Sequence, residues 1–409
     1  MVHARGAALD SDPGGLRLAA MMRVLCPAKI NLHLRVGRRR ADGFHPLLSW
    51  FTTVGLFDTL TVEDRREAVP PGRERAGAAR ILLLSSDLPG LAADESNLVV
   101  RAAEALAQTA ASRGEGDVKD ATGGLPLGDV RAGRESGGVD LRHSAAHGPA
   151  VPTGADVREG DVAPGTAGQR PTPMRSGEAD AGVRPVAARL EKQIPLGAGL
   201  GGGSSDAART LVALNRYWHL HRSMHQLAPI AAKLGSDVPF FLYGSSSVCT
   251  GRGEIVKPVP PPAVAKWVVL MLPEIHMPTA AVYGRFDELG LGFDAHIERA
   301  LPNWSEWSSR KSKDLLAGLV NDLERPAFEI RKDLGTLRAD IELKLGRPVR
   351  MSGSGSSLFT LYDEQGEAES AARIISSSFG VPRTLAAEMT PKLNDDLAAE
   401  TNNVAPPSR

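Results

Sequence analysis

The sequence predicts an α+β protein with two lobes. Strand patterns open the chain, a glycine-rich loop between a strand and a helix lies near its middle, and the proline-rich stretch Pro258–Pro262 precedes further strands and helices. With 409 residues, the chain is long enough for two or three domains. We therefore expect an N-terminal domain over 23–260 and a C-terminal domain over 261–392.

The composition argues against several classes of protein. Lys and Arg number 48, as do Asp and Glu, so a formal net charge of zero argues against a nucleic-acid partner. The 2 cysteines, Cys26 and Cys249, lie far apart in the sequence, do not show the spacing of metal ligands and do not suggest a disulfide framework. This favours the reducing cytoplasm as the location of the protein. Residues 1–20 lack the apolar core of a signal peptide, and no run of about 18 apolar residues predicts a membrane span. We expect a cytoplasmic protein.

Regular elements can be predicted on both sides of the glycine-rich loop. Alternating apolar residues predict a half-buried strand at Val24–Val36, with Lys29 and Asn31 on its polar face. Further strands are predicted in Phe44–Leu60 and at Val186–Ile194, Phe240–Tyr243, Trp267–Leu272 and Leu358–Tyr362. Helices are predicted at Asn97–Ala107, Ala207–Trp218, His225–Leu234, Lys313–Leu319 and Ala327–Leu345.

Three segments are expected to lack stable structure. No Phe, Tyr or Trp occurs from about residue 108 to 185, where Gly, Pro, Ala, Ser, Asp and Arg dominate. Such a segment buries too little apolar surface to offset its chain entropy. We interpret it as a disordered insertion in a surface loop, with a partner-binding segment as the alternative. Residues 1–22 are expected to form a disordered tail and residues 393–409 a loose one.

The run Pro195–Ser205 is the most informative stretch of the chain. It places 5 glycines within 7 residues, after a predicted strand and before a predicted helix. Glycine lets backbone N–H groups face a ligand, and a helix N-terminus adds unpaired donors and partial positive charge. The run therefore predicts a cradle for the phosphates of a nucleotide. A flexible linker is the alternative, but the flanking strand and helix argue against it.

Known phosphate-binding motifs fit this loop poorly. No lysine follows the glycines as in a P-loop, and the strand lysine and H-R-D sequence of protein kinases do not occur. Gly197, Gly199 and Gly202 match the dinucleotide pattern G-x-G-x-x-G, but after Asp206 the next acidic residue is Asp237. That separation is too long for the ribose-binding acid of such sites. A nicotinamide-dependent oxidoreductase is kept as an alternative.

The loop resembles the central motif of the GHMP kinases. Three further segments resemble motifs of the 4-diphosphocytidyl-2-C-methyl-D-erythritol kinase family: Pro27–Leu32 with Arg40–His45, Leu234–Phe241, and Ser352–Gly355. The resemblance runs from about Arg23 to Ala387 and omits the insertion. It implies an N-terminal lobe like domain 2 of ribosomal protein S5, a ferredoxin-like C-terminal lobe, and an active site in the cleft between them.

The resemblance also implies an activity. It is the ATP-dependent phosphorylation of the 2-hydroxyl of 4-diphosphocytidyl-2-C-methyl-D-erythritol, a step of the non-mevalonate route to isoprenoid precursors, with Mg²⁺ as cofactor. We expect a small-molecule enzyme that is a monomer or weak homodimer. The alternatives are another GHMP kinase, of the homoserine or mevalonate type, and a non-catalytic sensor on the same fold.

By the same resemblance, Lys29 and Asp237 are the candidate catalytic pair. Asp237 would accept the proton of the substrate hydroxyl or orient that hydroxyl, and Lys29 would favour its ionised form and stabilise negative charge in the transition state. From the pattern alone, Lys29 is a solvated strand lysine and Asp237 a turn residue. The two interpretations differ in whether these side chains converge.

The resemblance assigns the remaining site residues to two ligands. The residues assigned to substrate binding are Asn31, Phe44, His45 and Tyr283. The rings of Phe44 and Tyr283 would stack on the pyrimidine, and packing in the hydrophobic core is the alternative for both rings. ATP binding falls to Pro195, Leu196, Gly197, Ala198, Gly199, Leu200, Gly201, Gly202, Gly203, Ser204, Ser205, Asn97 and Lys192. Ser204 is also the candidate Mg²⁺ ligand, with helix N-cap as its structural alternative. Asp206 stands where asparagine is common in the family and receives no role.

Overall fold

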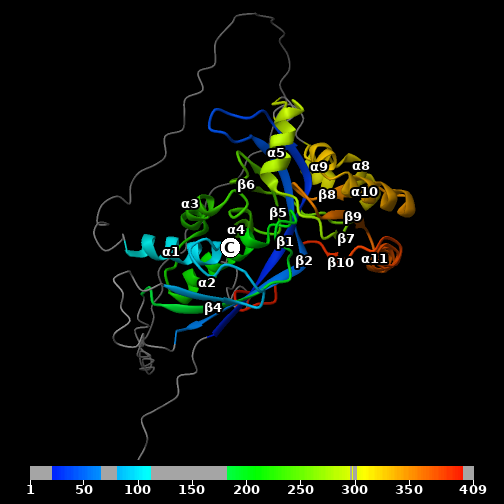
Figure 1. Cartoon of the computed structure of the whole chain (residues 1–409). Helices are drawn as coiled ribbons and strands as arrows, with labels where there is room; N and C mark the ends of the chain where they lie inside the picture. The colour runs from blue at the N-terminus through cyan, green and yellow to red at the C-terminus, as the bar shows by residue number, and fades with distance from the viewer. Residues whose placement is uncertain (1–20, 66–80, 112–181, 295–296, 298–301, 399–409) are drawn as a thin grey trace, which may run out of the picture. The chain divides into compact units, whose positions relative to one another are not determined.

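The computed structural model describes residues 21–65, 81–111, 182–294, 297 and 302–398. Most of the expected N-terminal tail and insertion, and the last part of the expected C-terminal tail, lie outside these residues. The described chain carries two sheets, each with helices packed against it (Figure 1).

The N-terminal half is built on a 6-stranded sheet. Its order is β3-β4-β2-β5-β6, and β1 pairs with β2 as a long antiparallel ribbon. The strands are β1 (Met21–Val36), β2 (Leu47–Asp64), β3 (Leu82–Ser86), β4 (Val186–Glu191), β5 (Ser246–Thr250) and β6 (Ile255–Pro258). The predicted strands at Val24–Val36, within Phe44–Leu60 and at Val186–Ile194 are thus confirmed, with shifted ends.

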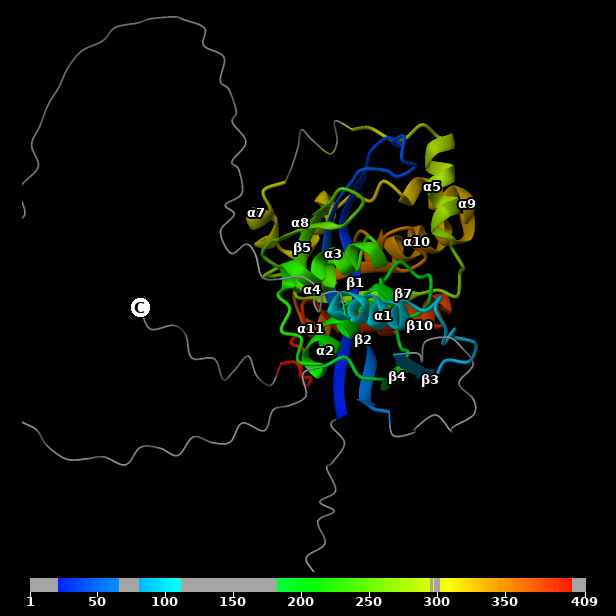
Figure 2. The same ribbon diagram turned by 90° about the vertical axis from the view of Figure 1, so that its left-hand side faces the viewer.

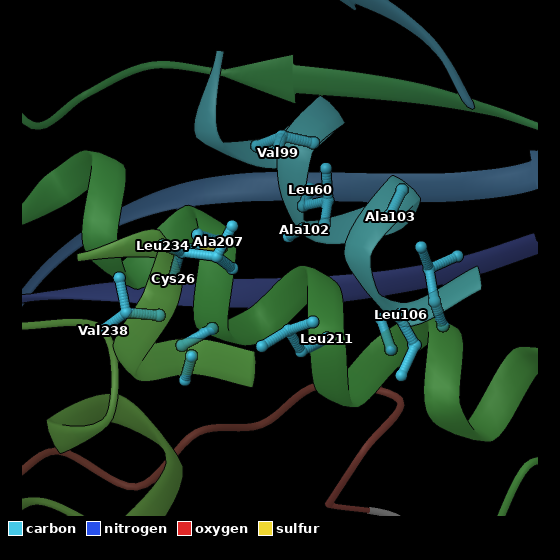
Figure 3. Close-up of a cluster of buried hydrophobic side chains, with 14 of the residues drawn as sticks. Cys26, Leu60, Val99, Ala102, Ala103, Leu106, Ala207, Leu211, Leu234 and Val238 are labelled. Carbon is cyan, nitrogen blue, oxygen red and sulfur yellow. The ribbon is translucent and has the colours of Figure 1, made fainter. Parts of the chain in front are cut away.

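Four helices of the described chain belong to this half. They are α1 (Leu98–Ala111), α2 (Gly202–Tyr217), α3 (Met224–Leu234) and α4 (Phe240–Tyr243). Apolar residues of α1 and α2, such as Leu106 and Leu211, pack with Cys26 of β1 and Leu60 of β2 in one buried cluster (Figure 3). Full burial of a large apolar side chain contributes about 1.5–3 kcal/mol, so this cluster holds the helices on the sheet.

The strand predicted at Phe240–Tyr243 is wrong, since this segment forms the helix α4. Pro239 precedes it with φ −58° and ψ −33°, which are helical angles. Proline at a helix start has its φ fixed for the helix and lacks only an N–H that would be unpaired there. The apolar run Phe240–Leu242 is buried as one helical turn.

The C-terminal half carries a 4-stranded antiparallel sheet of order β10-β7-β9-β8. Its strands are β7 (Trp267–Leu272), β8 (Arg350–Met351), β9 (Leu358–Tyr362) and β10 (Arg383–Glu388). The sheet changes between β6 and β7, which supports the proposed domain limit near residue 260. The strands predicted at Trp267–Leu272 and Leu358–Tyr362 are confirmed.

The described helices of this half are α5 (Thr279–Glu288), α7 (Trp304–Ser308), α8 (Ser312–Gly318), α9 (Glu324–Ile330), α10 (Lys332–Leu345) and α11 (Gln365–Phe379). Figures 1 and 2 both show α5 beside α9, and the two helices are in contact. The single helix predicted at Ala327–Leu345 is interrupted, because Arg331 has φ −123° and ψ 83° and separates α9 from α10.

The two sheets share buried residues. Ile30 of β1 and Trp50 of β2 belong to the same buried cluster as Leu270 of β7 and Phe359 of β9. An isolated bridge also joins Leu34 to Asn321. The long ribbon β1–β2 therefore contacts both halves, and a side chain on β1 can meet residues of either one.

The described start of the expected loose tail is held against the N-terminal half. The carboxylate of Asp395 is buried, pairs with Arg209 of α2 and accepts a hydrogen bond from the backbone N of Leu25 at 3.0 Å. Asp396 accepts from the backbone N of Arg23 at 2.6 Å. These contacts place residues 395–396 beside β1 and α2.

Within the described chain, no helix is both long and apolar enough to cross a membrane.

Candidate active site

A cavity of about 590 Å³ collects residues from both halves of the described chain. Its lining includes eight of the residues that the sequence predicted for the site, namely Lys29, Asn31, Phe44, His45, Gly199, Gly201, Asp237 and Tyr283. Ser354 also lines it and belongs to the segment Ser352–Gly355, the second glycine loop. The fold thus brings together side chains that lie far apart in the sequence, whereas Asn97 and Lys192 do not line this cavity.

Lys29 and Asp237 face one another in this cavity. Lys29 Nζ lies 3.4 Å from Asp237 Oδ2, and the side chains are 4% and 33% exposed. The ammonium also donates to Asn31 Oδ1 at 2.7 Å and to the carbonyl of Gly199 at 3.2 Å. Lys29 is therefore not a solvated strand lysine. Its charge is fixed between an amide, a loop carbonyl and a carboxylate, so little reorganisation is needed to stabilise an anion there.

The glycine-rich loop needs its glycines. Gly197, Gly199 and Gly201 have φ of +65°, +77° and +69°, a region that L side chains rarely adopt. A Cβ at Gly199 would lie 2.2 Å from the carbonyl oxygen of Ser352. The hydroxyl of Ser352 in turn donates to the carbonyl of Gly199 at 3.0 Å. The two glycine loops are thus packed directly on each other, beside Lys29.

The helix α2 starts within the loop. It begins at Gly202 with Gly201 as its N-cap residue, so Ser204 lies in the first turn and its predicted alternative as N-cap is wrong. The left-handed φ of Gly201 excludes most side-chain caps from that position. Ser205 Oγ is buried and has no hydrogen-bond partner among the described residues. The first turn, with its unpaired backbone N–H groups, thus begins directly after Gly201, which lines the cavity.

Lys192 occupies a buried charged cluster with Asp58 and Asp206. Its side chain is 3% exposed and pairs with both carboxylates. Asp58 Oδ1 also accepts from the backbone N of Gln193 at 2.6 Å and of Ile194 at 2.9 Å. Lys192 is therefore a buried, paired lysine and not one that a strand holds in solvent. The cluster ties β2 to the turn that enters the glycine loop and to α2.

Electrostatics in this cluster follow from burial and proximity. Burial raises the pKa of Asp206 to about 7, an effect that Lys192 opposes. Burial disfavours the Lys192 ammonium, but the two carboxylates outweigh it and raise its pKa. Lys192 thus stays charged, and its ammonium group is occupied by ion pairs with the two aspartates.

Asn97 caps the helix α1. Its Oδ1 accepts from the backbone N of Val99 at 2.9 Å, and its amide donates to the carbonyl of Ala92 at 2.7 Å. The next residue, Leu98, packs beside Gly203 of the glycine loop. Asn97 therefore lies near the N-terminus of α2 and has a structural role as the cap of α1. Its contact with ATP stays a proposal.

At the other end of the cavity, aromatic residues gather around His45. The rings of His45 and Tyr283 have centroids 5.2 Å apart, and Phe44 is 48% exposed with the Arg252 guanidinium 4.7 Å from its ring centroid. Burial raises the pKa of Tyr283, so its phenol stays protonated. An open ring beside an ordered pair of rings can stack a planar heterocycle.

Sequence reasoning missed three residues that line this end of the cavity, Arg39, Arg252 and Asp287. Arg39 directly precedes the motif Arg40–His45 without belonging to it, and Arg252 belongs to no motif. Asp287 follows Tyr283 by one helical turn on α5, and this spacing is the one signal by which it could have been found.

Comparisons with known proteins agree with this architecture. Residues 174–245 match the GHMP kinases N terminal domain and residues 308–381 the GHMP kinases C terminal domain. The 4-diphosphocytidyl-2-C-methyl-D-erythritol kinase of Burkholderia cenocepacia is 30% identical over 356 residues, which cover 85% of this chain and 87% of that protein. The enzyme of the same name from Heliobacterium modesticaldum is 31% identical over 394 residues, covering 92% and 99%.

Solved structures give the same result for the fold. A crystal structure of 4-(cytidine 5'-diphospho)-2C-methyl-D-erythritol kinase has a TM-score of 0.57 and 28% identity, covering 91% of this chain and 100% of that one. Homoserine kinase from Cytophaga hutchinsonii has a TM-score of 0.50 at 13% identity, covering 91% and 95%, which shows the fold alone. The predicted two-lobed α+β GHMP kinase fold is confirmed. The chain belongs to the 4-diphosphocytidyl-2-C-methyl-D-erythritol kinase family of the GHMP kinases.

Proposed function

We propose that this chain transfers the γ-phosphoryl group of ATP to the 2-hydroxyl of 4-diphosphocytidyl-2-C-methyl-D-erythritol, in the non-mevalonate route to isoprenoid precursors. The observation that carries the proposal is the contact of Lys29 with Asp237 at 3.4 Å in a cavity that the glycine-rich loop also lines. A cation and a proton acceptor beside a phosphate-binding loop are what phosphoryl transfer to an alcohol needs.

In this proposal the loop Pro195–Ser205 binds the triphosphate. Its left-handed glycines and the first turn of α2 present backbone N–H groups, and the helix N-terminus favours negative charge. Asn97 is proposed near the nucleoside end because Leu98 packs on the loop. Lys192 is proposed as a positioning residue, since its ammonium is engaged by Asp58 and Asp206.

Mg²⁺ is proposed as the cofactor, with Ser204 as a protein ligand. No group of three or more His, Cys, Asp or Glu side chains in the described chain could hold a metal by itself. The hydroxyl of Ser204 in the first turn of α2 suits a hard cation that takes most of its ligands from ATP phosphate oxygens and water. Bound there, Mg²⁺ would neutralise charge on the phosphates.

The transfer then uses this chain's own groups as follows. Asp237 orients the substrate hydroxyl and takes its proton, while the hydroxyl oxygen bonds to the γ-phosphorus and the bond from that phosphorus to the bridging oxygen breaks, releasing ADP. Lys29, fixed by Asn31 and Gly199, stabilises the charge that spreads over the phosphoryl oxygens. Phe44, His45 and Tyr283 hold the cytidine end. The cytoplasmic location and the monomeric or weakly dimeric state remain predictions.

A substrate panel tests this proposal. The purified protein is given MgATP with the cytidine diphosphate compound, mevalonate or homoserine, and ADP release is measured for each. We expect ADP only with the cytidine compound. Turnover of mevalonate or homoserine without turnover of the cytidine compound would assign another activity to the same fold.

A further inference from the structure

Asn321 joins the strand that carries Lys29 to the second glycine loop. This asparagine lies between α8 and α9 and is 6% exposed. It bridges Leu34 of β1, whose backbone N donates to the carbonyl of Val320 at 2.8 Å. The backbone N of Asp322 donates to the carbonyl of Leu34 at 3.0 Å. The main chain around Asn321 is therefore fixed on the same strand as Lys29.

The side chain of Asn321 holds the second glycine loop on both sides of Ser352. Its Nδ2 donates to the carbonyls of Met351 and Gly353, at 2.8 Å in each case. Its Oδ1 accepts from the backbone N of Leu323 at 2.9 Å. Because carbonyl oxygens only accept, the two carbonyls fix the orientation of the amide and use both of its N–H groups. Each polar atom of this side chain thus has a partner.

Ser352 connects the loop held in this way to the surroundings of Lys29. Its hydroxyl accepts from the backbone N of Asn31 at 3.2 Å and donates to the carbonyl of Gly199 at 3.0 Å. The same carbonyl accepts from Lys29 Nζ at 3.2 Å, so both of its lone pairs are used. A shift of the second glycine loop would therefore move an acceptor of the Lys29 ammonium. Small displacements of a catalytic group are costly in rate.

We propose that Asn321 is a positioning residue for phosphoryl transfer. Through Ser352, it holds in place the carbonyl that fixes the Lys29 ammonium. This inference rests on the proposed function. Asn321 does not line the cavity, so it acts on the reaction only through other residues. Its effect is expected in kcat, because the fixed cation stabilises charge in the transition state, and only weakly in KM.

A purely structural role for Asn321 makes a different prediction. If the amide only stabilises the fold, its loss lowers the free energy of unfolding and leaves the kcat of the folded enzyme unchanged. Asn215 of α2 is the matched control, since its amide donates to the carbonyl of Arg222 at 3.1 Å and its Oδ1 accepts from the backbone N of that residue at 3.0 Å. Asn215 also lies outside the cavity lining.

The first experiment measures ADP release with the cytidine diphosphate substrate in the wild type, Asn321→Ala, Ser352→Ala and Asn215→Ala. We expect Asn321→Ala and Ser352→Ala each to lower kcat by about tenfold or more, with both KM values within about threefold of the wild type. Asn215→Ala should keep the wild-type kcat. If Asn321→Ala does not fold, Ser352→Ala decides the test. A kcat within about twofold of the wild type in either variant, or an equal loss in Asn215→Ala, overturns the inference.

A double-mutant cycle asks whether Asn321 acts through Lys29. The kcat of Lys29→Met is compared with that of the double variant Lys29→Met, Asn321→Ala. Once the cation is absent, its position no longer matters, so we expect Asn321→Ala to cost less than about twofold in this background. A loss as large as that in the wild-type background would make the two residues independent and overturn the inference.

A chemical measurement separates failure of this inference from failure of the proposed function. Lys29 lines the cavity with 4% of its side chain exposed, so its rate of reaction with an amine-acylating reagent reports how firmly it is held. By mass spectrometry without substrate, we expect acylation of Lys29 to be about threefold or more faster in Asn321→Ala and unchanged in Asn215→Ala. If the wild type releases no ADP with the cytidine substrate, the proposed function is wrong, while this acylation result still supports the restraint of Lys29 by Asn321. Equal acylation rates in the wild type and Asn321→Ala overturn it.

Discussion

Lys29 Nζ lies 3.4 Å from Asp237 Oδ2, although one residue belongs to β1 and the other to the turn before α4. The lysine is the more constrained partner, since Asn31 and Gly199 also accept hydrogen bonds from its ammonium. This arrangement leaves the carboxylate open to the cavity while the cation stays in place. Separate substitutions of the lysine and the aspartate can therefore test the role of the fixed cation and the role of the proton acceptor independently.

The substitution Lys29→Met is expected to reduce kcat by about 100- to 1,000-fold, because it removes a fixed cation from the transferring phosphoryl group. The measurement is steady-state ADP release with the cytidine diphosphate substrate. Lys257→Met on β6, where the lysine is exposed, serves as the control and should keep wild-type rates. A Lys29→Met enzyme within tenfold of the wild type would remove this lysine from the mechanism.

Gly199→Ala tests the packing of the two glycine loops. Its new Cβ would meet the carbonyl oxygen of Ser352 at 2.2 Å, in addition to the strain of φ +77°. Gly90 has φ +78° but nothing within 4 Å of such a Cβ, so Gly90→Ala isolates the backbone strain. We expect a loss of ~1 kcal/mol for Gly90→Ala and at least ~3 kcal/mol for Gly199→Ala, with a raised KM for ATP in the latter.

Urea unfolding and ATP titration measure these two effects. Equal stability losses in both variants would mean that the second glycine loop does not restrain the first.

Lys192→Met probes the buried cluster with Asp58 and Asp206. Removing the shared cation leaves two buried carboxylates facing each other, so we expect a loss of about 3–5 kcal/mol in the free energy of unfolding. Asp64→Asn is the control, because Asp64 also belongs to β2 but pairs with Arg184 in a half-exposed ion pair. Its loss should stay below ~1 kcal/mol. Comparable losses in the two variants would show that the cluster contributes no more than a surface pair.

His33 gives the stability a defined dependence on pH. Burial lowers the pKa of His33 to about 4, and Arg35 acts in the same direction. In the unfolded chain the value is about 6.5, so the folded state favours the neutral ring. The contribution is therefore complete above about pH 6.5 and is lost as the pH falls toward 4, on the order of 3 kcal/mol in all. His33→Gln should flatten this dependence in urea unfolding at pH 7.5 and 5, and equal pH slopes in both proteins would contradict it.

The sequence predicted the elements whose patterns are local. The alternation in β1 and the apolar face of α2 are visible in single segments, and both elements form where expected. The strand prediction for Phe240–Tyr243 failed because four apolar residues fit a buried strand as well as a helical turn. Pro239 favours the helical turn. The break at Arg331 is a change in backbone angles that no composition signal marks.

The site residues that belong to recognisable motifs could be predicted from the sequence, and the others could not. The resemblance named Lys29 and Asp237, which the fold places together. The burial of Lys192 was not predictable, because its partners Asp58 and Asp206 come from β2 and α2, and a strand pattern says nothing about them. Asp287 was missed for the same reason, since only the tertiary fold places it beside His45.

Asp237→Asn gives the most direct test of phosphoryl transfer at this site. The variant keeps the size of the side chain but cannot accept the substrate proton. We predict that kcat falls by about 100-fold or more while the affinity for a non-hydrolysable ATP analogue stays within about twofold of the wild type. A variant that releases ADP at the wild-type rate with the cytidine diphosphate substrate would contradict the role of Asp237 and the catalytic site built around it.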